Sequence, residues 1–487
     1  MSLRPGWSRT AFALCSIALL SSCGGGGLVA GIEGTGTATV AAASSGPISR
    51  FGSIFVNGVE FDTTHASISI DGQSAAASQL SVGDVVEVQG SVATGGTTGT
   101  ATTVDYRSAV QGPISAVDAA GSTVTVLGQT VQIGPQTSLG AEAGGTPTFA
   151  SLVPGTLVEV SGFPAASGTV AATRVEIQTQ VSSYELAGIV ASVDPSTLQV
   201  IVNGVTIDFS GAQFTGFPAG AGLQVGDRIQ VESPVGAVSG TLLATRISLL
   251  PTLSAASGAQ GAVQGEVDGY VSPTQFQVDD TPVSTSAQTQ YQNGTVASLA
   301  AGIEVSVQGN FDSTGTLVAT TVRFAQTNPI LVRATVTAVD PTAGTLAVLG
   351  VPVSTDALTR FEDQTANPVA PFNLAAVAVG DYVEVHGHLS ASGVLQASVL
   401  TREDPNAEVE LRAPPSAAVA PSLTVLGVSA STSGATQFVG TDESSISSAQ
   451  FFSSAAGGST VDLVGSISGG VLQVTTATLP GEAELGD

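Results

Sequence analysis

The sequence predicts an all-β protein built as a tandem array of six small barrels, each with five antiparallel strands. Three observations lead to this prediction: a nine-residue strand motif that recurs along the chain, a composition typical of strands and turns, and one order of strand and turn signals in the units. The leading glycines of the motif copies are 71 to 78 residues apart, at Gly83, Gly155, Gly226, Gly302, Gly380 and Gly458.

The motif, residues 82–90 in its first copy, predicts a strand with one face toward a core. Val86 and Val88 share that face, because side chains alternate along a strand. A strand buried on both faces would need partners for polar side chains, so we expect the other face to be wet. The leading glycine predicts a turn, and the trailing glycine the strand's end or a bulge. The polar slots are Glu87, Glu159, Gln230, Ser306, Glu384 and Asp462.

The composition and the order of signals favour small barrels. Aromatic residues are 5% and charged residues 10% of the chain, while Gly, Ala, Ser, Thr and Val dominate, which is typical of short strands and turns, so we expect little helix. Each unit has an opening strand such as residues 112–118, a hairpin such as the one at Asn57 and Gly58, a loop, the motif strand and a closing strand. About five strands in this order fit a closed OB-like barrel. The main alternative is a β-solenoid, but solenoid coils are usually ~20–45 residues long, much shorter than this period.

The motif positions also divide the chain into segments. We expect a leader at 1–22, a flexible tether rich in small residues at 23–45, and a linker at 251–260. In the sixth unit, Pro414, Pro415 and further prolines replace the opening strand, so this unit is expected to be a degenerate cap, followed by a tail at 481–487. The expected repeats are 46–108, 109–180, 181–250, 261–326, 327–403 and, degenerate, 404–480.

The leader carries the most specific pattern in the chain. Arg4 and Arg9 precede an apolar run at residues 11–20, and the Leu-Ser-Ser-Cys sequence ending at Cys23 resembles the lipobox of bacterial lipoproteins. The resemblance implies that Cys23 is acylated and attaches the chain to a membrane. Gly24, in place of Asp, implies the outer membrane, with the protein facing the periplasm or the cell surface. The alternative is a plain secretory signal or an ordinary hydrophobic helix, although ten apolar residues are too few to span a bilayer.

Charge excludes one class of partner. The chain has no lysine, and without the leader ten arginines stand against 38 acidic residues, a net charge of −28. Such a surface repels nucleic acid and anionic lipid headgroups, and the five tyrosines are scattered over different units. Cys15 leaves with the leader, so no free thiol, disulfide or thiolate metal site is expected. The sequence therefore predicts no nucleic-acid partner and no cofactor.

The sharpest candidate site lies in the fifth motif copy. His386 and His388 are two residues apart on a predicted strand, so they share a face with Glu384, and two imidazoles with a carboxylate are zinc-type ligands. The matching slots of the first unit hold Glu87, Gln89 and Ser91, which indicates a solvated face. We therefore predict no metal centre and keep the three residues only as weak candidates. No catalytic motif is found, and no catalytic residue is assigned.

Several of these segments together resemble a known family. Residues 31–36, residues 46–61 and the motif strand at 82–90 are similar to an uncharacterised bacterial repeat family known only as a domain of unknown function. The resemblance spans most of the chain after the leader, is closest in the first unit and weakest in the sixth. It implies exported, often lipid-anchored β-barrel repeats, and it brings no activity with it.

Two functions remain open at this point. The first hypothesis is a non-enzymatic, lipid-anchored envelope protein that acts as a spacer or as an array for an unknown envelope or extracellular protein partner. The second is an enzyme, or a small-ligand or metal-binding protein, with its site in one divergent repeat. An array should carry special residues in matching slots, whereas a site should gather polar residues in one unit. The fifth unit, with Glu384, His386 and His388, is the mild case of the second kind.

Overall fold

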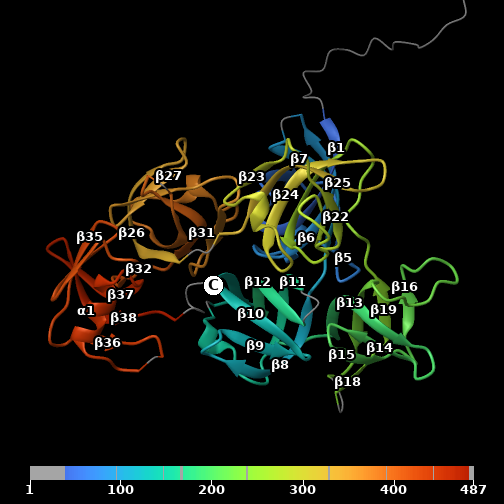
Figure 1. The fold of residues 1–487 in the computed structure, drawn as a ribbon, viewed down its shortest axis with the longest axis horizontal. Helices are drawn as coiled ribbons and strands as arrows, with labels where there is room; N and C mark the ends of the chain where they lie inside the picture. Colours follow the sequence, from blue (N-terminus) through green and yellow to red (C-terminus); the bar gives the residue numbers. More distant parts are fainter. Residues whose placement is uncertain are drawn as a thin grey trace, which may run out of the picture. The chain divides into compact units, whose positions relative to one another are not determined.

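A computed structural model describes residues 39–481, apart from residues 95, 146, 165–167, 237–239, 327–328, 391 and 443. The protein is all-β, 54% strand and 5% helical, and its sheet units repeat along the chain, as the ribbon in Figure 1 shows. The predicted all-β class is confirmed. Within the described ranges the helical segments are α1 (Ser448–Ala456) and the 3-10 turns η1 (Ala77–Gln79), η2 (Phe149–Ser151), η3 (Val296–Ser298) and η4 (Leu374–Ala376).

The terminal segments fall outside this description. The leader, Cys23 and residues 24–38 of the expected tether are outside the described residues, as are residues 482–487 of the expected tail. In the part of the chain that the structure describes, no helix has both the length and the apolar character needed to cross a membrane.

Each unit begins with an opening strand and a hairpin, as the sequence predicts. The opening strands are β1 (Thr39–Arg50), β8 (Val110–Asp118), β13 (Tyr184–Asp194), β20 (Gln260–Glu266), β26 (Ile330–Asp340) and β32 (Val409–Ala413). The hairpins are β2 and β3 (Ile54–Val56, Val59–Asp62), β9 and β10 (Thr123–Val126, Gln129–Ala141), β14 and β15 (Gln199–Val202, Val205–Asp208), β21 and β22 (Gln275–Val278, Thr281–Ser284), β27 and β28 (Thr345–Val348, Val351–Ser354), and β34 and β35 (Ser422–Val425, Val428–Ser431).

The motif strand and the closing strand complete each unit. The motif strands are β6 (Val85–Ala93), β11 (Leu157–Pro164), β17 (Arg228–Ser233), β24 (Glu304–Phe311), β30 (Tyr382–Leu389) and β37 (Val461–Ser468). The closing strands are β7 (Thr98–Tyr106), β12 (Thr169–Ile177), the interrupted β18 and β19 (Thr241–Leu243, Arg246–Leu249), β25 (Leu317–Phe324), β31 (Leu395–Glu403) and β38 (Val471–Thr478).

The loop before the motif is not strand-free, which corrects the expected five strands. It contributes a short strand that pairs in parallel with the closing strand in units one, three, four, five and six. In unit two the second half of β10 takes this place. These loop strands are β4 (Ser67–Ile70), β16 (Gln213–Thr215), β23 (Gln290–Gln292), β29 (Arg360–Asp363) and β36 (Gln437–Val439); β5 (Gln73–Ala75) and β33 (Ala417–Val419) are further short strands.

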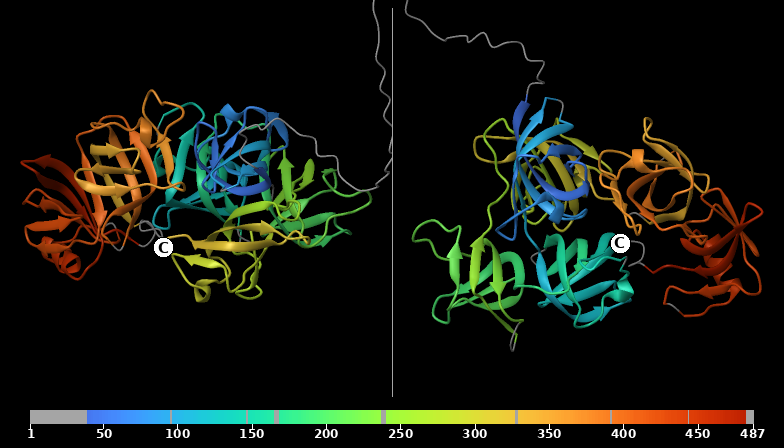
Figure 2. Two further views of the ribbon diagram at one scale, coloured as in Figure 1. Left: turned by 90° about the horizontal axis from the view of Figure 1, so that it is seen from above. Right: turned by 180° about the vertical axis from the view of Figure 1, so that it is seen from behind.

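The strand pairings of a unit close on themselves. In unit one the neighbours are β1 with β2, β2 with β3, β3 with β7, β7 with β6, and β6 with β1. The pairing of β3 with β7 is parallel, which corrects the expected all-antiparallel arrangement. A ring of five strands cannot alternate in direction all the way round, so one neighbouring pair must be parallel. Figure 2 shows the curved sheets that result.

The motif glycines have the roles that the sequence predicts. The leading glycine has a positive φ in every copy, for example +94° at Gly83 and +100° at Gly380, and starts the turn before the strand. The trailing glycine lies in a bulge, where a Cβ atom would be 2.1 Å from the carbonyl oxygen of Thr100 at Gly90 and of Gln396 at Gly387. Unit three has Ser233 in this slot, and its closing strand is interrupted there.

Opening strands of different units also pair with one another. β1 pairs in parallel with β20, while β8 pairs with β13, and β26 with β32, in the antiparallel sense. The units are thus joined as one with four, two with three, and five with six. Hydrophobic cores merge across the last two joints, where Val110 and Leu186, or Val332 and Leu411, are fully buried in one cluster.

Two expected boundaries change. Residues 39–45, placed in the tether, form the first half of β1 and pair with both β6 and β20. In the expected linker at 251–260, Leu253 is buried in the core of unit four and Gln260 begins β20. The sixth unit does have an opening strand, β32, which was missed because Pro414 follows it directly. Small residues such as Ala42 and Ala43 are as common in a flexible segment as in a buried strand, so composition alone did not distinguish the tether from the strand.

Candidate functional site

The polar slots of the motif strands are buried or half-buried, and none of the six is fully exposed. Gln230 and Asp462 are 1% and 8% exposed, and Glu159 is surrounded by hydrogen-bond donors from its own and the preceding unit. The expectation of a wet face is therefore wrong for these slots. The alternation along the strand is as predicted, but the second face is covered by polar partners from the same unit, as Arg412 is for Asp462, or from another unit, as Tyr106 is for Glu159.

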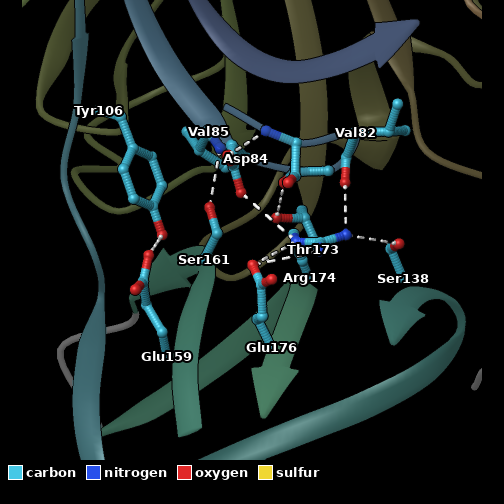
Figure 3. A network of polar contacts seen from close by, with 12 residues as sticks. Val82, Asp84, Val85, Tyr106, Ser138, Glu159, Ser161, Thr173, Arg174 and Glu176 are labelled. Atoms are coloured by element: carbon cyan, nitrogen blue, oxygen red, sulfur yellow. Dashed lines mark hydrogen bonds and ion pairs between the residues drawn. The ribbon is translucent and has the colours of Figure 1, made fainter. Parts of the chain in front are cut away.

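Units one and two meet at Arg174 of β12 (Figure 3). Its guanidinium lies 3.8 Å from the Asp84 carboxylate and 3.2 Å from the Glu176 carboxylate, and it donates to the hydroxyl of Ser138 at 3.2 Å. It also donates to the carbonyl oxygen of Val82 at 3.4 Å. We call this group the Arg174 junction. It ties the turn that starts β6 to two strands of unit two.

Main-chain groups of the motif turn take part in the same junction. The hydroxyl of Thr173 donates to the carbonyl oxygen of Gly83 at 2.6 Å, and the amide of Val85 donates to the hydroxyl of Ser161 at 2.7 Å. A Cβ atom on Gly83 would be 2.8 Å from the carbonyl oxygen of Thr173. The motif glycine therefore also lets the two units approach closely.

A second contact between these units lies beside the first (Figure 3). The phenol of Tyr106 donates to Glu159 at 2.8 Å, and the amides of Gln111 and Gln178 donate to the other oxygen of Glu159 at 3.0 and 3.2 Å. Tyr106 is 2% exposed. A buried carboxylate with three donors is well satisfied, so this contact fixes the two units relative to each other at this point.

Unit three reaches unit one through a third polar group. The Gln230 amide nitrogen lies 2.6 Å from Asp71 and 2.6 Å from Glu185, and its amide oxygen accepts from Arg107 at 2.9 Å. Asp71 also accepts from the amide of Ser108 at 2.9 Å. Two carboxylates therefore share one side-chain amide in a buried place.

Burial gives these carboxyl groups unusual protonation. Desolvation raises the pKa of Asp84 to about 8, against the opposing effect of Arg174. Desolvation, together with the charge of Asp71, raises the pKa of Glu159 to about 7 and that of Glu185 to about 9. All three groups therefore bind protons far more tightly in the folded protein than in the unfolded chain.

Arginine side chains recur at the other joints, although the mature chain expected from the sequence has few of them. These contacts were not predicted from the sequence. The signal that could have indicated them is the small number of basic residues among many acidic ones, because each arginine then has many carboxylates with which to form an ion pair. The further pairs between units are Arg228 with Asp279 at 2.9 Å, Arg323 with Asp356 at 3.7 Å, and Arg333 with Glu410 at 3.6 Å.

The predicted histidine group is only partly assembled. His386 Nε2 lies 2.8 Å from Glu384 Oε1, and both residues line a cavity of about 600 Å³ with Arg333. His388 lines a different cavity, of about 670 Å³. The expectation that the two histidines share a face with Glu384 is therefore not met, because the bulge at Gly387 shifts the register between them.

The charges around Glu384 are those of an ion-pair network. Arg333 lies 3.5 Å from Glu384 and 2.7 Å from Glu403. Burial would raise the pKa of Glu384, but the hydrogen bond with His386 and the nearby positive charges outweigh it and leave this pKa lowered. Among the residues that the structure describes, no group of three or more His, Cys, Asp or Glu side chains is placed to hold a metal ion.

The family described as "Domain of unknown function (DUF5666)" matches five segments that together cover more than half of the chain: residues 37–105, 111–176, 187–248, 261–323 and 333–400. The chain belongs to this family. No curated protein matches it.

The DUF5666 matches correct the repeat count to five instead of six. The sixth unit keeps the pairing of its opening, motif and closing strands, β32 with β37 and β37 with β38. Its opening strand has only five residues, and α1 stands where η1 to η4 precede the motif in other units. The sixth unit thus departs from the other units within the same pairing scheme, and it lies outside the five matches.

The aspartate that follows the leading glycine of the motif has a local role in addition to its place in the junction. The side chains of Asp84, Asp227 and Asp381 each accept from a backbone amide three residues earlier, at 2.7, 2.7 and 3.0 Å. The aspartate thus closes the turn that carries the leading glycine. Asp84 differs from the other two in being buried beside Arg174.

Proposed function

We propose that this chain is a non-enzymatic, lipid-anchored envelope protein whose DUF5666 repeats form a spacer or a protein-interaction array. The observation that carries the proposal is the way the units are joined. Backbone pairing between opening strands and buried polar contacts such as the Arg174 junction link them, and the described residues between 39 and 481 belong to one compact unit. A spacer must hold a fixed length, and an array must hold its binding surfaces in fixed positions.

The individual repeats support the same proposal. We infer that each is a small OB-like barrel, on the basis of the closed ring of pairings and the core of alternating apolar residues inside it. The net charge of −26 disfavours the nucleic-acid ligands that many such barrels bind. The partner we propose is a protein of the envelope or the cell exterior.

Anchoring is proposed from the sequence alone. The lipobox-like sequence ending at Cys23 supports acylation at that residue, and Gly24 supports an outer-membrane location that faces the periplasm or the cell surface. When cells are labelled with a palmitate analogue, the wild-type protein should incorporate the label and the Cys23→Ser variant should not. Equal labelling of the two would contradict the anchor. Ser22→Ala is a suitable control, because small residues are expected at that position.

The interaction function needs its own experiment. Crosslinking on intact cells, followed by mass spectrometry of the captured proteins, should return the same few envelope or extracellular proteins with wild type in independent cultures. Capture should fall strongly in Arg174→Ala, which loosens the junction between units one and two, and should stay unchanged in Arg246→Ala, whose ion pair with Glu232 lies within unit three. If no protein is captured above the background of untagged cells, the interaction array is contradicted and the spacer remains as the proposed function.

A ligand-binding or enzymatic role is the second candidate, and one observation favours it. The cavity of about 600 Å³ that Glu384, His386 and Arg333 line is polar and has charges of both signs. The ion pairs of Arg333 already satisfy much of that charge within the protein. A structural role for these residues therefore explains their arrangement without a ligand.

A further inference from the structure

The opening strands follow one rule in their choice of partner. Along one edge, the first part of β26 (residues 331–333) pairs with β32, and the second part (residues 336–340) pairs with the unit's own hairpin strand β27. In β8 the same edge pairs with β13 at residues 110–111 and with β9 at residues 114–118. The other edge holds the motif strand in both cases. The first part of the opening strand is thus open to a strand from outside its own unit.

Five such repeats cannot all be paired among themselves. Units one and four pair with each other, as do units two and three, and this leaves the opening strand of unit five. Its partner is β32, which belongs to the sixth unit, outside the DUF5666 matches. β32 has five residues, three of which (410–412) pair with β26, and it ends at Ala413, before Pro414.

We infer that the first part of the opening strand is a docking edge for the opening strand of another such unit, and that residues 404–481 serve to occupy this edge in unit five. When β32 is removed, the edge of β26 binds a second copy of this chain. The inference goes beyond the proposed function, because it concerns how the array ends and requires neither the lipid anchor nor an outside partner.

The exposed edge would be a strong site for self-association. Unpaired amide and carbonyl groups on an edge strand are a template for another strand, and β26 would also expose Leu331 and Val332, which are 4% and 0% exposed in the intact chain. Two identical strands can pair antiparallel about a two-fold axis. The pairings of β8 with β13 and of β26 with β32 show that opening strands of this protein pair with each other in the antiparallel direction or with a strand that takes the same place.

The side chains of β26 fit a second copy of the same strand. In the intact chain Leu331 lies opposite Arg412, and Val332 lies opposite Leu411. In a two-fold pair centred on Val332, Leu331 would lie opposite Arg333 of the other copy, and Val332 opposite Val332. The leucine–arginine pair and the apolar centre are both retained, so a second copy is the occupant we expect.

The first test uses residues 24–487, which contain the whole compact unit. Leu411→Pro removes a ladder position of β32, and Leu411→Val is the matched control that keeps it. Light scattering after gel filtration should give twice the mass for Leu411→Pro as for Leu411→Val. The inference is overturned when Leu411→Pro has the mass of the control while hydrogen exchange shows β32 open and β30 still protected.

A second arrangement avoids any dependence on how the proline variant folds. A protease site inserted between Asp404 and Glu408 allows the sixth unit to be removed after the whole chain has folded. The remaining chain, carrying Val332→Cys, should form a dimer linked by a disulfide between the two copies. A cut chain that remains monomeric, or that associates without this disulfide, overturns the inference.

Discussion

The carboxylate of Asp84 in unit one lies 3.8 Å from the guanidinium of Arg174 in unit two, and both side chains are almost fully buried. The pair joins the turn of one DUF5666 motif to the closing strand of the next repeat. Because charged groups lose their hydration when buried, each depends on the other and on the hydrogen bonds around it. Several predictions about the stability of the joint depend on this arrangement.

Arg174→Ala should destabilise the protein strongly. It removes the donor to Ser138 and Val82 and leaves Asp84 and Glu176 without their cation, and loss of one partner of a buried pair costs about 3 kcal/mol or more. The measurement is the urea midpoint of the transition that includes units one and two, taken at pH 9, where Asp84, with a pKa of about 8, is ionised. Arg246→Ala is the control: its ion pair with Glu232 lies within unit three and is more exposed, so the change should stay below about 1 kcal/mol.

Stability should fall as pH rises from about 5 to about 9. A carboxyl group whose pKa is raised on folding binds more protons in the folded state, so its contribution is present at low pH and is lost as pH rises through the folded pKa. That value is about 8 for Asp84 and about 7 for Glu159. Melting temperatures at pH 5, 7 and 9 should decrease in that order. Asp84→Asn should reduce the slope, and an unchanged slope would contradict the raised pKa of Asp84.

Gly387→Ala should destabilise unit five. The new Cβ atom would lie 2.1 Å from the carbonyl oxygen of Gln396, so the closing strand must move, and overpacking of this kind costs about 1–3 kcal/mol. Gly434→Ala is the control, because nothing lies within 4 Å of a Cβ atom there. Hydrogen exchange of β30 and β31 amides reports on unit five directly. Equal protection in the two variants would show that the bulge does not need glycine.

Zinc should bind only weakly to unit five. His386 is hydrogen-bonded to Glu384, and His388 lines another cavity, whereas a catalytic zinc site needs three protein ligands and a structural site four. Calorimetric titration of the metal-stripped protein with Zn²⁺ should give no tight binding and no gain in melting temperature. Sub-micromolar affinity that is lost in His386→Ala but kept in His65→Ala would favour the ligand-binding function instead.

Local features of the fold were predictable from the sequence. Val86 and Val88 point into the core because side chains alternate along a strand. The recurrence of glycine at the end of the motif indicated the bulge that is found at Gly90. The hairpin at Asn57 and Gly58 follows from the same kind of local signal, with φ of +50° and +79° at the two residues.

The contacts between units were not predictable in this way. Tyr106 and Glu159 are 53 residues apart, and Arg174 and Asp84 are 90 apart, so no local period relates them. The pairing of β1 with β20 joins units that are not neighbours in sequence. The shared face predicted for His386 and His388 is wrong for a related reason, since the bulge at Gly387 breaks the alternation of side chains between them.

The central claim is that the repeats are joined through their opening strands, and cysteine crosslinking in intact cells tests it most directly. Gln111 lies opposite Glu185, and Arg333 lies opposite Glu410, and Cα atoms of opposed antiparallel residues are about 4.5–5.5 Å apart, within disulfide range. We predict that Gln111→Cys with Glu185→Cys, and Arg333→Cys with Glu410→Cys, each crosslink within one chain, whereas Gln111→Cys with Glu410→Cys does not. Absence of the two matched crosslinks, or equal formation of the mismatched one, would contradict it.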